Sequence, residues 1–500
     1  MKIVLLLLLS ALSLPAQPVP LAYQDLYTQL SVNIAIFDAV VKSGWNGSAY
    51  PYLRAPHLLV ADSSNYTSLL GVNYYQYAVE PALDEMQALG ANAVTVTVDF
   101  PIFYQPFFSY VGSSQYPQFT AFYQRLAADV HARGMKFVIE SSCSDPPVGN
   151  VVTFAAFMAT FNWTQYQAAR AADTVATLQA LDVDYVTVMT ESDTEEAISG
   201  QTALGTVTGV VQEVTTILSA LTAAGSKIPV GGGVGTWTAN YLQYVDALVA
   251  LPISFLDIHI YPINQNGSNN YFALALQGAQ AAAAAGKPSA ISECWLYKIR
   301  NSELGNTAQA VIYGRDPFSF WAPLDTAFLW TVAELADYQH MLFVSPFWTE
   351  YLFAYLDYST YGSLPDITVS ADALGAAETA NGTGAFTSTG LAYERMNVPA
   401  DTSPPATPAA PTSGGVGYTT ATVDWIAGSD NVGVSAYKLY RNGTLIATTT
   451  QLVYYDSGLS WSTSYSYTLA AVDASGNVSA MSPALVIKTH ENSRLPMRNK

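Results

Sequence analysis

Two glutamates follow apolar runs that have the composition of buried strands. Glu191 comes shortly after residues 185–189 (YVTVM), and Glu293 directly follows residues 289–292 (SAIS). Hydrolysis of a glycosidic bond requires one carboxyl group that protonates the leaving oxygen and a second that attacks the anomeric carbon or activates water. If the fold brings the two runs close together, Glu191 and Glu293 could supply both groups. An unpaired carboxylate beside a core is costly, which favours a chemical role over a purely structural one.

Other polar and aromatic residues also stand at the ends of apolar runs. They are Asp99, Glu140, Trp237, His259, Tyr261 and Trp348. We expect His259 to orient a neighbouring group rather than to act as an acid. Asp99 and Glu140 could face a sugar or support the rim of the site through hydrogen bonds. Aromatic residues that could stack on sugars, or equally be packed in the core, are Trp237, Trp295 and Tyr104.

These residues mark a repeat in which a short apolar strand is followed by an amphipathic helix. Such alternation predicts parallel strands joined by helical crossovers. Strands are expected at 70–74, 93–99, 136–140, 185–189, 228–232, 255–261, 289–292 and 342–347, and helices at 81–89, 119–132, 165–181, 207–223, 240–250, 271–285 and 323–339. Eight such units predict an α/β fold, the (β/α)8 or TIM barrel, over residues 18–398. Catalytic groups of such barrels lie at the C-terminal strand ends.

A change of composition separates this barrel from a small C-terminal domain. Residues 399–415 read PADTSPPATPAAPTSGG, which cannot bury enough apolar surface to fold and predicts a semi-extended linker. Residues 416–490 contain short alternating runs split by turn residues, which predict an all-β domain. Asn442 and Gly443 predict a two-residue hairpin, because a type I′ turn needs positive φ at both central positions.

The placement of the two glutamates at the ends of strands four and seven resembles glycoside hydrolase clan A, a group of retaining TIM-barrel glycosidases. The resemblance spans roughly residues 65–355 and includes His259-Ile-Tyr261, which is similar to a His-x-Tyr motif of family 5 members. It implies that Glu191 is the acid/base and Glu293 the nucleophile. It also implies that Tyr261 contacts the nucleophile and that Trp348 forms the aromatic platform under the sugar.

Two positions depart from the pattern of the clan. Thr190 stands where members commonly carry an Asn that binds the sugar 2-hydroxyl, and Asp99 stands where many carry Arg. Recognition of the sugar at the cleavage point is therefore not carried over from the resemblance, and Thr190 itself is the expected substrate contact at that place.

The C-terminal domain resembles a fibronectin type III domain. The similarity lies in Trp425 in an early strand, the hairpin sequence YKLYRNG, and the run 465–473 followed by Gly476-Asn477. The resemblance implies a small all-β sandwich that acts as a passive spacer or, alternatively, as a weak attachment module for glycans or surfaces.

The N-terminus predicts export. Lys2 is followed by an apolar run and by Pro15-Ala16, which is typical of a secretory signal peptide over residues 1–17, and the run is too short for a membrane-spanning helix. We expect a secreted, extracellular or periplasmic chain without membrane insertion. Cys143 and Cys294 are too few for a disulfide scaffold, and we expect two unbridged thiols.

Charge excludes other partner classes. The chain has 19 basic and 38 acidic residues, a net charge of −19, with only 11% charged residues, and no cluster of Lys and Arg could neutralise phosphates. Nucleic acid is therefore not an expected partner. The acidic stretch 191–196 (ESDTEE) lacks the ligand spacing of a metal loop and is expected to be solvated. We expect no metal and no cofactor.

These observations favour a secreted retaining glycoside hydrolase that cleaves a β-linked polysaccharide, such as a glucan, mannan or galactan, by double displacement. The alternative is a non-catalytic secreted protein that binds glycans or mediates adhesion on a degenerate barrel. Polysaccharide or oligosaccharide is the expected partner in both cases.

Overall fold

The computed structural model describes residues 18–143, 151–266, 269–304, 309–381, 383–396, 403–430, 434–449, 451–473 and 477–491. The chain divides into two compact units, Met1–Asn397 and Val398–Lys500. The predicted signal peptide, residues 1–17, lies outside the described residues.

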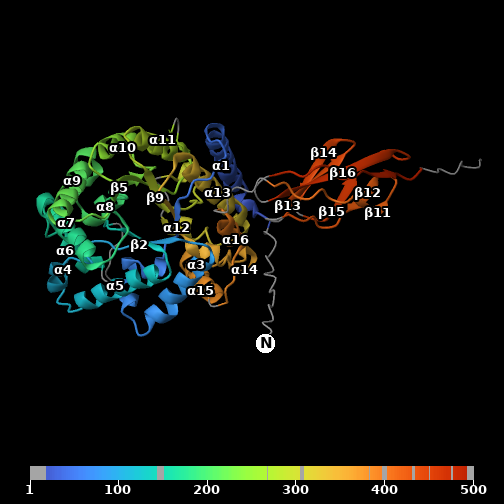
Figure 1. The fold of residues 1–500 in the computed structure, drawn as a ribbon. Helices are drawn as coiled ribbons and strands as arrows, with labels where there is room; N and C mark the ends of the chain where they lie inside the picture. Colours follow the sequence, from blue (N-terminus) through green and yellow to red (C-terminus); the bar gives the residue numbers. More distant parts are fainter. Residues whose placement is uncertain are drawn as a thin grey trace, which may run out of the picture. The chain divides into compact units, whose positions relative to one another are not determined.

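The first unit is a ring of eight parallel strands with helices around it (Figure 1). Its strands are β1 (Leu53–Arg54), β2 (Ala93–Thr97), β3 (Lys136–Glu140), β4 (Tyr185–Thr187), β5 (Val230–Gly235), β6 (Phe255–Ile260), β9 (Ser289–Cys294) and β10 (Phe343–Pro346). They pair in the order β1-β10-β9-β6-β5-β4-β3-β2. A parallel bridge between His57 and Thr95 joins the two ends of this order. The predicted (β/α)8 barrel is confirmed.

Helices precede, connect and follow these strands and surround the barrel (Figure 1). They are α1 (Gln24–Gly44), α2 (Tyr66–Leu69), α3 (Glu80–Ala88), α4 (Gln105–Tyr110), α5 (Tyr116–Ala132), α6 (Val151–Met158), α7 (Trp163–Ala180), α8 (Ser192–Ser199), α9 (Val207–Ala223), α10 (Tyr241–Val249), α11 (Tyr271–Ala284), α12 (Gln309–Tyr313), α13 (Ala322–Gln339), α14 (Tyr358–Tyr361), α15 (Asp366–Asn381) and α16 (Ser388–Arg395). A short antiparallel pair, β7 (Gln265–Asn266) and β8 (Asn269–Asn270), precedes α11. All seven predicted helices correspond to observed ones.

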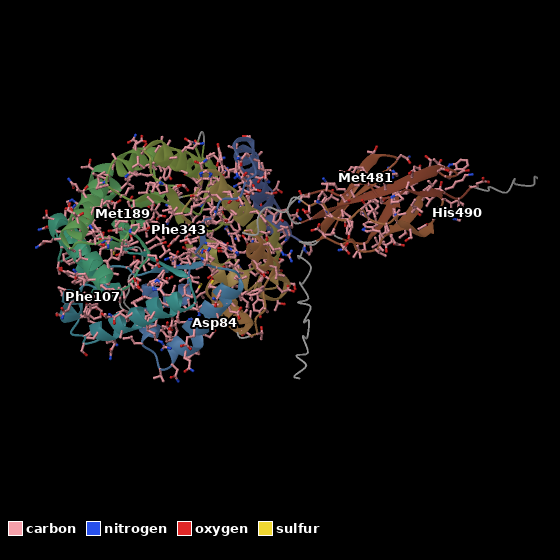
Figure 2. All side chains as sticks on the ribbon, in the orientation of Figure 1. Asp84, Phe107, Met189, Phe343, Met481 and His490 are labelled. Carbon is pink, nitrogen blue, oxygen red and sulfur yellow. The ribbon has the colours of Figure 1, made fainter. Side chains whose placement is uncertain are left out.

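Side chains of alternating size fill the inside of the barrel. Tyr185, Phe255 and Phe343 pack ring against ring, with centroids 5.5 to 6.1 Å apart, and Phe343 lies inside the ring of strands (Figure 2). Small residues from the other strands, including Ala93, complete this layer. A Cβ at Gly231 would overlap the Phe255 ring, so glycine is required there. The packed layer lies toward the N-terminal ends of the strands, because Glu140, His259 and Glu293 come later in β3, β6 and β9 than the residues that fill it.

The first barrel strand differs from its predicted position. Residues 70–74 do not form a strand: Val72 is 88% exposed and Asn73 has φ of 60°. The strand is instead β1, which continues to the bridge at His57. Arg54 and Pro56 interrupt the apolar pattern of this segment, which is why the sequence does not mark it as a buried strand.

The second unit is a β-sandwich. One sheet contains β11 (Thr412–Val416), β12 (Thr420–Asp424) and β15 (Val453–Ser457), and the other contains β13 (Val434–Arg441), β14 (Thr444–Thr449), β16 (Ser464–Asp473) and β17 (Leu485–Lys488). Trp425 and Tyr467 are among the side chains of its core. The predicted hairpin joins β13 to β14, with φ of 50° at Asn442 and 80° at Gly443.

The predicted linker, residues 399–415, extends too far into this sandwich. Residues 399–402 lie outside the described residues, and Thr412 already belongs to β11. Between them, Pro405, Pro408 and Pro411 are buried, and the Ala406 N–H donates to the Ser429 carbonyl at 3.0 Å. The buried prolines recur at every third residue and the residues between them are exposed, so the prolines form the packed face of this segment. Composition alone did not reveal that this face packs.

Candidate active site

The two glutamates singled out by the sequence meet at the C-terminal ends of their strands. Glu191 is the residue before α8, and Glu293 lies in β9. One carboxylate oxygen of each, with a ring nitrogen of His259, lies within a set whose members are all within 4.8 Å of one another. The two side chains are 14% and 11% exposed. Both carboxylates are therefore shielded but reachable from solvent.

His259, from β6, lies between the two carboxylates. Its Nδ1 lies 3.1 Å from Glu191 Oε1 and 3.5 Å from Glu293 Oε2. On the other side of the ring, Nε2 lies 2.8 Å from Ser292 Oγ, and the Ser292 hydroxyl donates to Asp257 Oδ2 at 2.6 Å. Because the Ser292 proton is used toward Asp257, its oxygen is placed to accept from Nε2–H. Nδ1 faces an oxygen of each glutamate, and these acidic neighbours favour the imidazolium form of His259.

Tyr261 contacts Glu293 as the resemblance implied. Its hydroxyl donates to Glu293 Oε2 at 2.6 Å, and Thr194 donates to Glu191 Oε2 at 2.6 Å. A donor to a carboxylate favours the charged form and fixes its direction. Each glutamate thus has a hydroxyl donor in addition to His259.

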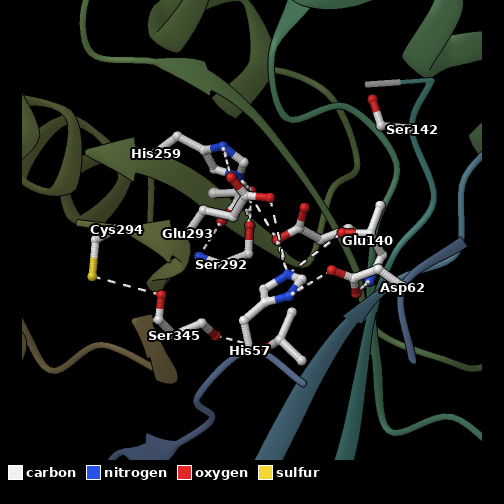
Figure 3. A network of polar contacts seen from close by, with 12 residues as sticks. His57, Asp62, Glu140, Ser142, His259, Ser292, Glu293, Cys294 and Ser345 are labelled. Carbon is white, nitrogen blue, oxygen red and sulfur yellow. Dashed lines mark hydrogen bonds and ion pairs between the residues drawn. The ribbon is translucent and has the colours of Figure 1, made fainter. Parts of the chain in front are cut away.

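A third carboxyl group and a second histidine complete the cluster. Figure 3 shows Glu293 between His259 on one side and Glu140 with His57 on the other. His57 Nε2 lies 3.7 Å from Glu140 Oε1 and 3.9 Å from Glu293 Oε1, and its Nδ1 lies 3.5 Å from Asp62 Oδ2. The sequence did not identify His57 or Asp62, because the first strand was placed too late in the chain. The sequence signal that could have identified His57 is that it is one of only five histidines and is flanked by apolar residues.

Burial and neighbouring charges shift the pKa values of this cluster in opposite directions. Burial, followed by the charge of Glu140, raises the pKa of Glu293 well above its usual value. Burial also opposes ionisation of Glu140, but the close approach of His57 and the charge of His259 outweigh it and lower the pKa of Glu140. For both histidines burial favours the neutral ring, yet the surrounding carboxylates raise their pKa values well above 6.5.

A chain of aromatic rings lies beside the carboxylates. Successive rings of Trp237, Tyr261, Tyr297, Tyr313 and Trp348 lie 4.7 to 5.9 Å apart between centroids. Trp237 and Trp348 are partly exposed. Their role in sugar binding stays a prediction. The sequence did not single out Tyr297 and Tyr313, whose hydroxyls lie 3.0 Å apart.

Four predicted substrate contacts are not available to a ligand or lie apart from the cluster. Trp295 is 1% exposed and its ring packs against Tyr351, so it has no face free for a sugar. Asp99 is fully buried and accepts the Ser142 N–H at 2.9 Å, which makes it a support of the loop after β3. Thr190 is 1% exposed.

Tyr104 is the fourth. It packs among Phe100, Phe157 and Phe161, with centroids 5.5 to 6.4 Å apart, and is therefore part of an aromatic cluster.

The acidic stretch after Glu191 is not a solvated loop. It forms α8, and Glu195 is fully buried against Arg170, with Arg170 Nε 3.2 Å from Glu195 Oε1. Arg170 Nη2 also donates to the carbonyls of Ser141 and Val188 at 2.8 and 3.0 Å. One buried guanidinium thus ties α8 to the ends of β3 and β4, and so fixes the segment that carries Glu191.

Within the part of the chain that the structure describes, two sets of three side chains have the spacing of metal ligands. They are His57 with Glu140 and Glu293, and Glu191 with His259 and Glu293. Both sets share Glu293, and the positive charge that balances the carboxylates in each comes from a histidine already. We assign neither set to a metal. Cys143 and Cys294 are buried and unbridged, as expected. Within the described residues, no helix has the length and apolar character needed to cross a membrane.

Comparison with known proteins gives similarity over a short part of the chain. No protein-family model matches it. Chitinase Chi52 of Paenibacillus xylanexedens is 43% identical over 96 residues, which cover 19% of this chain and 18% of that protein. Exoglucanase B of Cellulomonas fimi is 44% identical over 89 residues, 18% of this chain and 8% of that protein. The chain thus spans less than a fifth of either relative.

The matched lengths correspond to one small domain, and the two relatives are named for different activities. The match therefore assigns no activity to this chain. Among solved structures, the endo-beta-1,4-mannanase from Thermotoga petrophila aligns with 89% of this chain and 99% of its own, with 10% sequence identity and a TM-score of 0.38.

Proposed function

We propose that the barrel is a retaining glycoside hydrolase that cleaves a β-linked polysaccharide, a glucan, mannan or galactan, outside the cell. The proposal rests chiefly on one observation: carboxylate oxygens of Glu191 and Glu293 lie within 4.8 Å of each other at the C-terminal end of a (β/α)8 barrel. Retaining enzymes hold their two carboxyl groups about 5 to 5.5 Å apart, whereas inverting enzymes leave about 6.5 to 9.5 Å for a water molecule. The short spacing supports retention.

In the proposed mechanism, the two glutamates act in two steps. Glu293 attacks the anomeric carbon while Glu191 protonates the departing oxygen, which leaves a glycosyl ester on Glu293. Glu191 then deprotonates a water molecule that breaks the ester. The Tyr261 hydroxyl and the His259 imidazolium hold Glu293 in direction, since they lie 2.6 and 3.5 Å from its Oε2. The aromatic chain from Trp237 to Trp348 offers apolar faces to a sugar.

Reducing-end release from glucan, mannan, galactan and xylan by the purified mature chain tests the activity. Glu191→Gln should abolish hydrolysis and leave glycan binding intact, because the amide keeps the shape of the side chain but cannot transfer the proton. Glu196→Gln, which changes a carboxyl on the same helix α8 away from the cluster, is the matched control and should keep full activity.

Proton NMR of the first product tests the stereochemistry. We expect the β-anomer to appear before mutarotation, and initial release of the α-anomer would exclude the covalent intermediate on Glu293. If the parent chain binds glycans but hydrolyses none of the panel, the alternative function, a non-catalytic glycan-binding protein, replaces the proposal.

A further inference from the structure

The arrangement of Glu140 and Glu293 carries a consequence beyond hydrolysis. Glu140 comes from β3 and Glu293 from β9, and their carboxylates belong to a set of atoms within 4.8 Å of one another. The Glu140 side chain is 1% exposed and the Glu293 side chain is 11% exposed. Among the described groups, none donates a hydrogen bond to Glu140 Oε1. Two carboxylates at this separation and depth repel strongly if both are ionised, so a single proton between them is favoured.

The surrounding charges cannot neutralise every carboxylate. Two cations face the pair: His57, from the segment after β1, and His259, from β6. Each is also held by a further carboxylate. His57 lies 3.5 Å from Asp62, and His259 lies 3.4 Å from Asp257. Among the described residues, the other titratable groups near the pair are Glu191 at the end of β4 and the Tyr261 hydroxyl after β6. Carboxylates therefore outnumber imidazoles in the cluster.

We propose that Glu140 and Glu293 form a dyad that shares one proton, and that His57 is the positioning residue that draws the negative charge of the dyad toward Glu140. His57 Nε2 lies 3.7 Å from Glu140 Oε1 and 3.9 Å from Glu293 Oε1, so it borders both members. The lowered pKa of Glu140 and the raised pKa of Glu293 are the opposite shifts that two carboxyl groups show when they share one proton.

The dyad has a defined use in the attack. When the shared proton lies on Glu293, its O–H bond breaks, an O–H bond forms on Glu140, and the negative charge moves onto Glu293, which can then attack the anomeric carbon. Positive charge that develops on the sugar favours this shift. The proton sharing does not depend on the proposed function, whereas its use in attack rests on it.

Infrared spectroscopy at pH 6 tests the sharing without any substrate, by counting protonated carboxyl groups. Relative to the parent chain, Glu140→Gln and Glu293→Gln should each lose one protonated carboxyl, and the double variant should also lose only one. Glu213→Gln is the matched control: burial raises the pKa of Glu213 to about 8, so this variant should lose one group whether or not the dyad is present. The dyad is overturned if the double variant loses two protonated carboxyl groups. It is also overturned if one of the single variants loses none.

The pH profile gives a second readout that a purely structural role would not move. Glu140→Gln removes the nearest negative charge and should shift the acidic limb of turnover to lower pH. His57→Asn removes a cation and should shift the limb to higher pH. Shifts in the same direction overturn the role of His57. If the parent hydrolyses no glycan, the infrared count still decides the dyad, so the two proposals fail separately.

Discussion

At the scale of single residues, the Tyr261 hydroxyl offers the simplest test of the site. Its loss in Tyr261→Phe should raise the pKa of Glu293 further and loosen its direction, because a donor to a carboxylate favours the charged form. We expect turnover to fall about tenfold to a thousandfold, the scale of one hydrogen bond to a charged group in a transition state. The acidic limb of the pH profile should move to higher pH, and the thermal unfolding midpoint should barely change.

Tyr297→Phe is the control for this change. The Tyr297 ring packs 4.7 Å from that of Tyr261, but its hydroxyl pairs with Tyr313 rather than with a carboxylate. The Tyr297→Phe variant should therefore leave the acidic limb of the pH profile of turnover unchanged. An unchanged limb in Tyr261→Phe would show that the hydroxyl does not govern the ionisation of Glu293.

The residues that the sequence could identify were those at the ends of recognisable strands. Glu191, His259, Tyr261 and Glu293 meet because parallel strands of a barrel end on one side. The contact between Glu140 and His57 could not be predicted from the sequence, because the strand that leads to His57 is interrupted by Arg54 and Pro56. Burial likewise could not be read from residue type: the sequence does not distinguish the packed Trp295 from the partly exposed Trp348.

At the scale of elements, buried charge joins helices to strands. Arg170 on α7 binds Glu195 on α8, and Glu213 on α9 lies 3.7 Å from the same guanidinium. Both Glu213 oxygens lack a hydrogen-bond donor among the described groups. Burial, with the charge of Glu195, raises the pKa of Glu213 to about 8. Glu213 is therefore protonated in the folded chain at neutral pH.

This raised pKa predicts a specific dependence of stability on pH. The unfolded chain ionises Glu213 near its ordinary pKa of about 4.3, whereas the folded chain does so near 8. The contribution of Glu213 to the free energy of unfolding is thus fully present below about pH 4 and falls as pH rises toward 8. The Glu213→Gln variant lacks this loss of stability with rising pH. Between about pH 4 and pH 8, the difference in free energy of unfolding between parent and variant should change by on the order of 1 kcal/mol per pH unit.

Urea unfolding at several pH values between 5 and 8 measures this difference. Other buried acids with raised pKa values, such as Asp173, are present in both chains, so their effects cancel. Parallel pH curves for the two chains would show that Glu213 is ionised in the fold, as a partner of Arg170.

Element types were more predictable than element limits. Seven of the eight barrel strands follow from apolar runs, because strands buried on both faces are continuously apolar. The missed strand, β1, pairs over only two residues before Pro56 and depends on its neighbours for burial. The limits of the linker before β11 were also misplaced. There, the regular spacing of the prolines indicates a packed face, whereas their number alone indicates an unfolded linker.

At the scale of the whole molecule, the division at Asn397 predicts that the barrel is autonomous. The carboxylate cluster, the aromatic chain and the helices that support them all precede that residue. A chain that ends at Asn397 should keep its turnover on soluble oligosaccharides and its own thermal transition. Calorimetry of the full chain and the shortened chain checks this. A drop of the barrel transition by many degrees after shortening would show that the sandwich stabilises the barrel.

The prolines that lead into the sandwich have a consequence for how the protein behaves in crowded solution. Four of the eight residues from 404 to 411 are proline, and three of them are buried on one face. Proline has no amide hydrogen to donate, so this stretch cannot serve as a template for a strand from another molecule. The entrance to the sandwich is thereby protected against edge-to-edge aggregation, and that protection survives as long as the face stays packed.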